Sequence, residues 1–332
     1  MPGNAKRVVI VARFGEGMGF PAARTSLCVS DLVWPELDAA AWAATRKSLH
    51  LYTQMLGKLR VALSPSQPNW MFTALLLSAR GVTTGPLPWH GRSLEGSLDV
   101  FSSELRLALS DGRSRCIALV PARTIAEVYA DLLAALKALG VDVTLSPVPQ
   151  EVADVTPFHT DRRPAAYDPA AVERWFRIVT ATAGIFDNWR AHFFGRNGIQ
   201  LWWGALDFAL LLFSGKHVPP PTDRGYLLRY DLDAEMLNVG FYPGDDATAP
   251  FFYGYIVPQP PNASQLPIAP ASAAWSDTMH EWVLPYDAVR TAANPAGELN
   301  AFLDALYALC VSAAGWDRSA LSYIAPKRPA HT

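Results

Sequence analysis

Residues 49–60 read Leu-His-Leu-Tyr-Thr-Gln-Met-Leu-Gly-Lys-Leu-Arg, and the spacing of side chains in and around this stretch predicts the helix on which the fold is built. Apolar side chains recur at every seventh position: Trp42, Leu49, Leu56 and Leu63. This period places one apolar stripe along a helix that begins near Leu37. Asp38 stands where a residue that caps the start of this helix is expected.

A second, polar stripe follows the apolar one at four-residue spacing: Arg46, His50, Gln54 and Lys58. Residues at this spacing project from the same face of a helix. Gly57 interrupts the face, where glycine costs about 1 kcal/mol relative to alanine. We therefore expect another segment to approach the backbone closely at Gly57. The stripe indicates either a wall of a wet pocket or the solvent boundary of an ordinary amphipathic helix.

The composition of the 332 residues excludes several classes of protein. Half of the residues are hydrophobic, the net charge is −2 and the pI is near 6.4, which argues against binding to nucleic acids or to membrane surfaces. Three widely separated cysteines predict neither a disulfide framework nor a zinc site, so a cytoplasmic location is expected. The histidines are scattered and redox motifs are absent, so neither a metal nor a cofactor is expected.

The order of the patterns predicts an α+β fold made of two similar α–β-meander–α halves with antiparallel sheets, packed as one globular unit. The expected divisions are an N-terminal arm (1–31), a first half (32–150), a proline-rich linker (151–166) and a second half (167–325). Helices are expected at 124–139, 169–194 and 298–313. Strands of the second half are expected at 200–213, 226–231, 237–242, 251–257 and 282–285.

Asp207 is the main candidate for chemistry in the second half, because it interrupts an apolar run that begins Trp-Trp-Gly-Ala-Leu. A buried carboxylate needs a partner. If the run is one strand, alternation places Trp203 and Asp207 on the same face. Asp207 is then either a general base or amine anchor lined by Trp203, or half of an ion pair with an arginine such as Arg190. Nearby strands carry aromatic residues with polar tips, which line a site or fill the core: Tyr242, Tyr253, Tyr255, Trp282 and Tyr286.

Several motifs between residues 34 and 318 resemble those of an uncharacterised bacterial family catalogued as domain of unknown function 5996. The matching segments are Trp34–Leu37, His50–Gln54 with Gly57-Lys58, Arg80–Thr84, Tyr167–Pro169, Trp203-Gly204 with Asp207-Phe208, Phe213–Lys216, Gly240–Gly244, Leu284–Arg290 and Gly315–Asp317. The resemblance implies a shared structure for these motifs and no activity. Where similar proteins have a His-Glu pair before Gly-Phe-Trp-Pro-Gly, this chain has Asp233-Ala234-Glu235, and Tyr242 replaces the tryptophan.

These residues suggest a cofactor-free enzyme for a small anionic or zwitterionic metabolite. The residues expected to act are His50, Lys58 and Asp207 in catalysis, with Gln54, Arg60, Arg80, Trp203, Tyr242, Tyr253 and Tyr286 in substrate binding. Cations would bind the anionic group and Asp207 would hold or deprotonate an amine, which suits elimination or ring closure with loss of sulfate or phosphate. The alternative is a non-catalytic binding or partner protein that assembles with another subunit or with itself.

Overall fold

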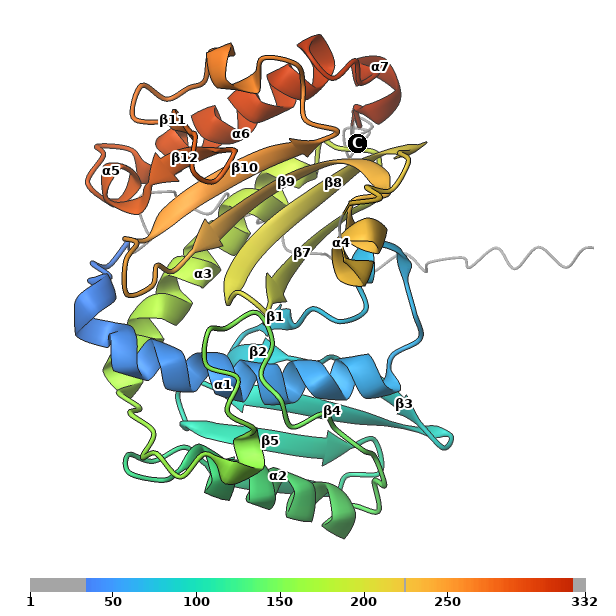
Figure 1. Cartoon of the computed structure of the whole chain (residues 1–332), viewed down its shortest axis with the longest axis vertical. Coiled ribbons are helices and arrows are strands. Elements are labelled where there is room, and N and C mark those ends of the chain that lie inside the picture. Colours follow the sequence, from blue (N-terminus) through green and yellow to red (C-terminus); the bar gives the residue numbers. More distant parts are fainter. Residues whose placement is uncertain (1–33, 224, 325–332) are drawn as a thin grey trace, which may run out of the picture. The chain divides into compact units, whose positions relative to one another are not determined.

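Helix α1, Ala39–Leu63, runs between two antiparallel sheets and is buried along most of its length (Figure 1). The computed structural model describes residues 34–223 and 225–324, which belong to one compact unit. Asp38 caps α1 as expected, because its carboxylate accepts hydrogen bonds from the N–H groups of Ala40 and Ala41 at 2.8 and 3.1 Å. The apolar stripe faces inward, with Trp42, Leu49 and Leu56 no more than 2% exposed.

The first sheet packs on α1 and α2. Its strands are β1 (Leu76–Ser78), β2 (Gly81–Thr83), β3 (Leu87–Trp89), β4 (Arg92–Asp99), β5 (Glu104–Leu109) and β6 (Ser114–Ala118). They pair in the order β1-β2-β4-β5-β6, with β3 also on β4. Alternate residues of β4 and β5 are buried, so one face meets the helices. Thr124 begins α2 (Ile125–Ala138) with a capping box to Glu127.

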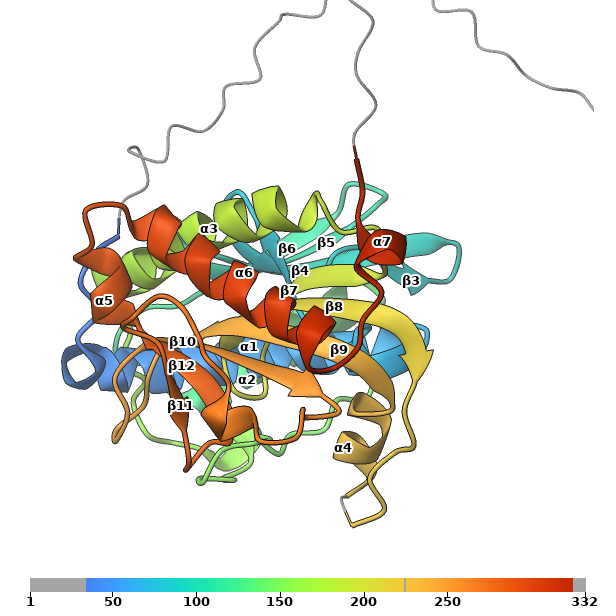
Figure 2. The ribbon, with the colours of Figure 1, turned by 90° about the horizontal axis from the view of Figure 1, so that it is seen from above.

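The second sheet is covered on one face by two long helices, α3 (Pro169–Arg190) and α6 (Pro295–Ser312), as Figure 2 shows. Its strands are β7 (Asn197–Trp202), β8 (Asp207–His217), β9 (Ala234–Tyr242), β10 (Phe251–Val257), β11 (Ala274–Ser276) and β12 (Glu281–Pro285). They pair in the order β7-β8-β9-β10-β12-β11, all antiparallel. Because Gly254 has no side chain, Leu306 of α6 packs directly against β10.

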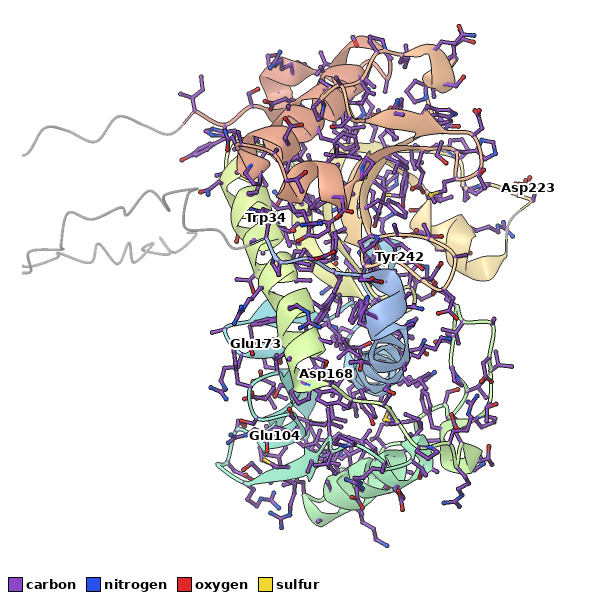
Figure 3. The ribbon with its side chains drawn as sticks, turned by 90° about the vertical axis from the view of Figure 1, so that its left-hand side faces the viewer. Trp34, Glu104, Asp168, Glu173, Asp223 and Tyr242 are labelled. Atoms are coloured by element: carbon purple, nitrogen blue, oxygen red, sulfur yellow. The ribbon has the colours of Figure 1, made fainter. Side chains whose placement is uncertain are left out.

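The remaining helices are short: α4 (Tyr226–Asp231), α5 (Tyr286–Arg290) and α7 (Arg318–Leu321), with 3₁₀ turns at Pro68–Trp70, Phe158–Thr160 and Ala263–Gln265. Helix α4 lies beside the face of the second sheet that α3 and α6 leave uncovered (Figure 2). Asp168 begins α3, where its carboxylate accepts a hydrogen bond from the N–H of Ala170 at 2.9 Å (Figure 3). Tyr242 ends β9 near α1 in the same view. The uncovered face of the second sheet therefore looks towards α1 and α4.

The structure confirms the predicted α+β class with antiparallel sheets. The two halves share the order helix, sheet, helix, while their internal duplication and the proposed boundaries stay predictions. The predicted N-terminal arm, residues 1–31, lies outside the described residues. The expectation for 251–257 is confirmed to the residue, and the helices at 124–139, 169–194 and 298–313 are confirmed with small shifts at their ends.

Two expectations about strands are wrong. The segment 226–231 is helix α4 rather than a strand, because a short apolar run fits either structure until tertiary packing decides. Residues 200–213 are not one strand but parts of β7 and β8, joined by a turn in which Leu206 adopts a φ of 60°. Trp203 therefore lies in this turn, and the alternation argument that paired it with Asp207 does not apply.

Candidate functional site

A cavity of about 990 Å³ lies on the face of the second sheet opposite α6, because its lining residues of β8, β9 and β10 share the face opposite Gly254. Its volume is at the upper end of the range for small-molecule sites. Aromatic side chains form most of the apolar lining: Trp70, Trp202, Trp203, Tyr242, Phe251, Tyr253 and Tyr255. Carboxylates supply most of the polar lining: Glu151, Asp207, Asp231, Asp245 and Glu281. Strands β8, β9, β10 and β12 form the floor, while the loop around Glu151 and the end of α4 contribute walls.

Asp207 is at the floor of this cavity and is 8% exposed. Its Oδ2 accepts a hydrogen bond from the hydroxyl of Tyr253, which comes from β10, two strands away. Gly240 of β9 lies between them and pairs with Tyr253 in the sheet register. A Cβ atom on Gly240 would overlap the Tyr253 hydroxyl. The glycine therefore allows the tyrosine ring to cross β9 and reach Asp207.

Burial raises the pKa of four cavity carboxylates, and the charges of neighbouring carboxylates add to this effect in Asp207, Asp231 and Glu281. Burial raises the pKa of Asp207 to about 7, and the charge of Glu151 adds to this, while the Tyr253 hydrogen bond opposes it. Burial likewise raises the pKa of Asp231 to about 7, with contributions from Glu151 and Asp207. Burial and the charge of Asp207 raise the pKa of Glu281 to about 7. Near neutral pH these three groups are therefore poised between their acid and carboxylate forms.

The described part of the lining contains no lysine, arginine or histidine. Asp207 has no ion pair within residues 34–223 and 225–324. A buried carboxylate without a cation either takes up a proton or is stabilised by a positive group that enters. Aromatic faces also attract organic cations through the ring quadrupole. The described lining therefore suits a positively charged group with an apolar body.

Three residues of the polar stripe of α1 bond to protein backbone instead of facing the cavity, namely His50, Gln54 and Lys58, while Arg46 forms an ion pair with Asp246 at 3.0 Å. His50 Nε2 lies 2.9 Å from the carbonyl oxygens of both Trp203 and Gly204, so it carries the proton that both accept. Burial is the main cause that lowers the pKa of His50, and it keeps the ring neutral. Gln54 forms two hydrogen bonds of 2.8 Å with the backbone N–H and carbonyl of Gln150.

Lys58 completes this row by donating from Nζ to the carbonyl oxygen of Val148 at 2.7 Å. Burial lowers its pKa to about 8. The expectation at Gly57 is confirmed: a Cβ atom there would overlap the indole of Trp203. Trp203 also donates from Nε1 to the carbonyl of Thr73 at 2.8 Å. The stripe thus fixes two wall segments, 148–151 and 203–204, without lining the cavity itself.

Three predicted substrate-binding residues lie elsewhere, and the structure corrects their expected placement. Arg60 donates to the carbonyl oxygens of Phe72 and Thr84, which fixes the entry to the first sheet. Arg80 is 59% exposed and forms an ion pair with Asp99 at the edge of that sheet. Tyr286 is 1% exposed and donates to the carbonyl of Pro35 at 2.7 Å. Each side chain satisfies a local backbone or charge requirement, so the expected cluster of anion-binding cations is not assembled.

Trp203, Asp207, Tyr242 and Tyr253 are the predicted site residues that do line the cavity. The acidic and amide residues of the lining that sequence reasoning missed are Gln150, Glu151, Asp231, Asn238, Asp245 and Glu281. Asn238 carried a usable signal, because it interrupts the apolar strand Met-Leu-Asn-Val-Gly as Asp207 interrupts its own. The four carboxylates carried none, since each stands within two positions of another polar side chain and so interrupts no apolar run.

The family model described as "Family of unknown function (DUF5996)" matches residues 34–323, and the chain belongs to this family. The resemblance inferred from the motifs is therefore confirmed. No curated protein matches the chain, and no solved structure matches it. Within the described residues, no helix has the length and apolarity needed to cross a membrane. Among those same residues, no group of three or more His, Cys, Asp or Glu side chains is arranged to ligate a metal ion.

Proposed function

We propose that the cavity binds a small cationic or zwitterionic metabolite through a protonated amine, and that Asp207 receives this amine. The observation that carries the proposal is the buried Asp207 carboxylate, which has Tyr253 as its side-chain partner and no described cation beside it. An entering ammonium group would supply the missing charge and up to three N–H donors. The surrounding rings would pack on the apolar part of the ligand.

We further propose that the protein is a cofactor-free enzyme in which Asp207 removes a proton from the bound ammonium group. A general base works best when its pKa is near the working pH, and burial raises the pKa of Asp207 to about 7. The neutral amine that results is a nucleophile that can close a ring: a C–N bond forms while the bond from that carbon to the sulfate or phosphate group breaks, the anion leaves with the electron pair, and Asp207 keeps the proton. No cation among the described lining residues would stabilise a sulfate or phosphate leaving group. The proposal therefore rests on the deprotonation of the amine.

The test is differential scanning fluorimetry with primary amines, using benzylamine and n-hexylamine as probes, and sulfate and phosphate as anionic probes. A ligand at about a hundred times its dissociation constant adds roughly 2.7 kcal/mol of stability. We expect amines to stabilise the wild type and to lose this effect in Asp207→Asn. The matched control is Asp131→Asn, which removes one carboxylate from the exposed face of α2.

Equal stabilisation of wild type and Asp207→Asn by amines would contradict the proposal. Stabilisation by sulfate or phosphate alone would restore the original expectation of an anion site. Amine binding without any chemical change of bound metabolites, followed by mass spectrometry, would favour the alternative of a binding or partner protein. That alternative has some structural support, because Phe194 and Ile324 are 69% and 87% exposed close to the paired segments 193–194 and 321–323.

A further inference from the structure

The cavity has a second polar region, formed by Asn238, Tyr255 and Glu281, which we call the Asn238 end. Asn238 is 7% exposed, and its Nδ2 donates to the hydroxyl of Tyr255 at 2.8 Å. Its Oδ1 is buried and accepts no hydrogen bond from the described residues. Buried acceptors are nearly always paired in folded proteins. Because Asn238 lines the cavity, a ligand that donates a hydrogen bond at this end can satisfy the oxygen once the amide turns slightly towards it.

The backbone of the Asn238 end lies apart from that of Asp207, although the charge of Asp207 still reaches Glu281 across the cavity. Asn238 pairs with Leu211 of β8, which is four residues beyond Asp207, or about 14 Å along the strand. Glu281 begins β12, which is the third strand from β8 across the sheet. Strands β8 and β12 are therefore also about 14 Å apart, measured across the sheet. Carboxylates from distant parts of the floor therefore face a single cavity.

The floor between the two regions is apolar. Gly240 presents no side chain, and the ring of Tyr253 lies across it. The rings of Tyr253 and Tyr255 stack with their centroids 6.3 Å apart, which extends the aromatic surface towards the Asn238 end. An aliphatic chain lying on this surface would contact ring faces along its length. The floor thus has an acidic group at each end and an aromatic surface between them.

We propose that the ligand is an elongated dication, an α,ω-diamine, with one ammonium group at Asp207 and the other at the Asn238 end. This inference rests on the proposed function and specifies its ligand class. The second ammonium group donates to Asn238 Oδ1 and pairs with Glu281. A quaternary ammonium group has no N–H, so it would leave Asn238 Oδ1 unpaired and fits this end poorly. The aromatic floor binds the methylene chain.

The test is isothermal titration calorimetry with α,ω-diamines of four to eight carbons and with monoamines of the same chain lengths. A hydrogen-bonded charge contributes about tenfold or more in affinity, so the best diamine should bind at least about tenfold more tightly than its monoamine. Glu281→Gln and Asn238→Leu should remove this advantage, so that each variant binds the diamine no more tightly than the monoamine of the same length. The matched control is Glu173→Gln, on the exposed side of α3 (Figure 3).

The outcomes separate this inference from the proposed function. If monoamines and diamines bind wild type equally and Asp207→Asn weakens both, the diamine inference is wrong and the amine site stands. If no amine binds wild type, the proposed function fails and the inference fails with it. Glu281→Gln differs from the wild type by one atom, so it provides the test even if Asn238→Leu does not fold. An unchanged diamine advantage in Glu281→Gln would also overturn the inference.

Discussion

Replacing Asp207 with asparagine should stabilise the folded protein at pH 8. The pKa of Asp207 is about 7 in the folded chain, mainly because of burial, and its ordinary value is 3.8. Between these two values the folded state holds a proton that the unfolded state has released. Stability is therefore lost as pH rises from about 4 to about 7. Asparagine has nearly the same shape, keeps an oxygen for Tyr253 and does not ionise, so the variant should escape this loss.

The size of the effect follows from the two pKa values. One pKa unit corresponds to about 1.36 kcal/mol, so the difference between 3.8 and about 7 amounts to up to about 4 kcal/mol. Wild type and Asp207→Asn should have nearly equal free energies of unfolding near pH 4. The variant should become more stable as pH rises, and the difference should be constant above pH 7. This gain would be the opposite of the loss usually seen when a buried, paired carboxylate is removed.

Urea unfolding of both proteins at intervals between pH 4 and pH 8, without ligand, measures this difference. Asp131→Asn is again the control, because it also changes one carboxylate to an amide but lies on the exposed side of α2. Parallel stability curves for wild type and Asp207→Asn would refute the reasoning, since they would mean that Asp207 has the same pKa in both states. A variant that is less stable at pH 8 would show that the ionised carboxylate has a favourable partner.

Three further predictions follow from the cavity and its glycines. Affinity for n-hexylamine should rise up to about tenfold per pH unit between pH 5 and 7 in calorimetry, because the carboxylate form of Asp207 binds the cation; a flat profile would contradict this. Gly57→Ala should destabilise the protein by about 1–3 kcal/mol in urea unfolding, because its methyl group overlaps Trp203; unchanged stability would show that the indole moves freely. Gly240→Ala should displace Tyr253 and weaken amine binding in calorimetry. The control is Gly184→Ala in α3, where the added methyl group meets open space; it should stabilise the protein by about 0.5–1 kcal/mol and leave amine binding unchanged. Equal amine affinity in the two variants would refute the role of Gly240.

The elements that could be predicted are those whose local pattern and tertiary environment agree. Helix α1 has an apolar stripe of period seven and a capping aspartate, and both act as the sequence indicates. Helix α2 has a complete capping box. The errors fall where local signals are ambiguous. The run from Trp202 to Asp207 reads as one strand, because four consecutive apolar or small residues hide the turn that Gly204 and Leu206 form.

The site could be predicted only in part, because its residues come from segments that lie far apart in the sequence. Asp207 was identifiable because a charge in an apolar strand requires an explanation. Glu151, Asp231 and Glu281 have no such local contrast, and only the fold brings them to one cavity. The positions of the lysine and arginine side chains could not be predicted for a different reason. A sequence shows that lysine and arginine are present, but it does not show which backbone carbonyl groups will satisfy them.

The polar stripe on α1 and the cavity are nevertheless linked through the backbone. His50 and Gln54 bond to the segments that carry Trp203, Gly204 and Gln150. Glu151 follows directly, and a Cβ atom on Gly204 would overlap its carboxylate. A change at the stripe would therefore move two walls of the cavity together, although no stripe side chain lines it. The resemblance of residues 50–58 and 203–208 to family motifs has a physical explanation in this shared framework, in which α1 determines the position of the acidic wall relative to the floor.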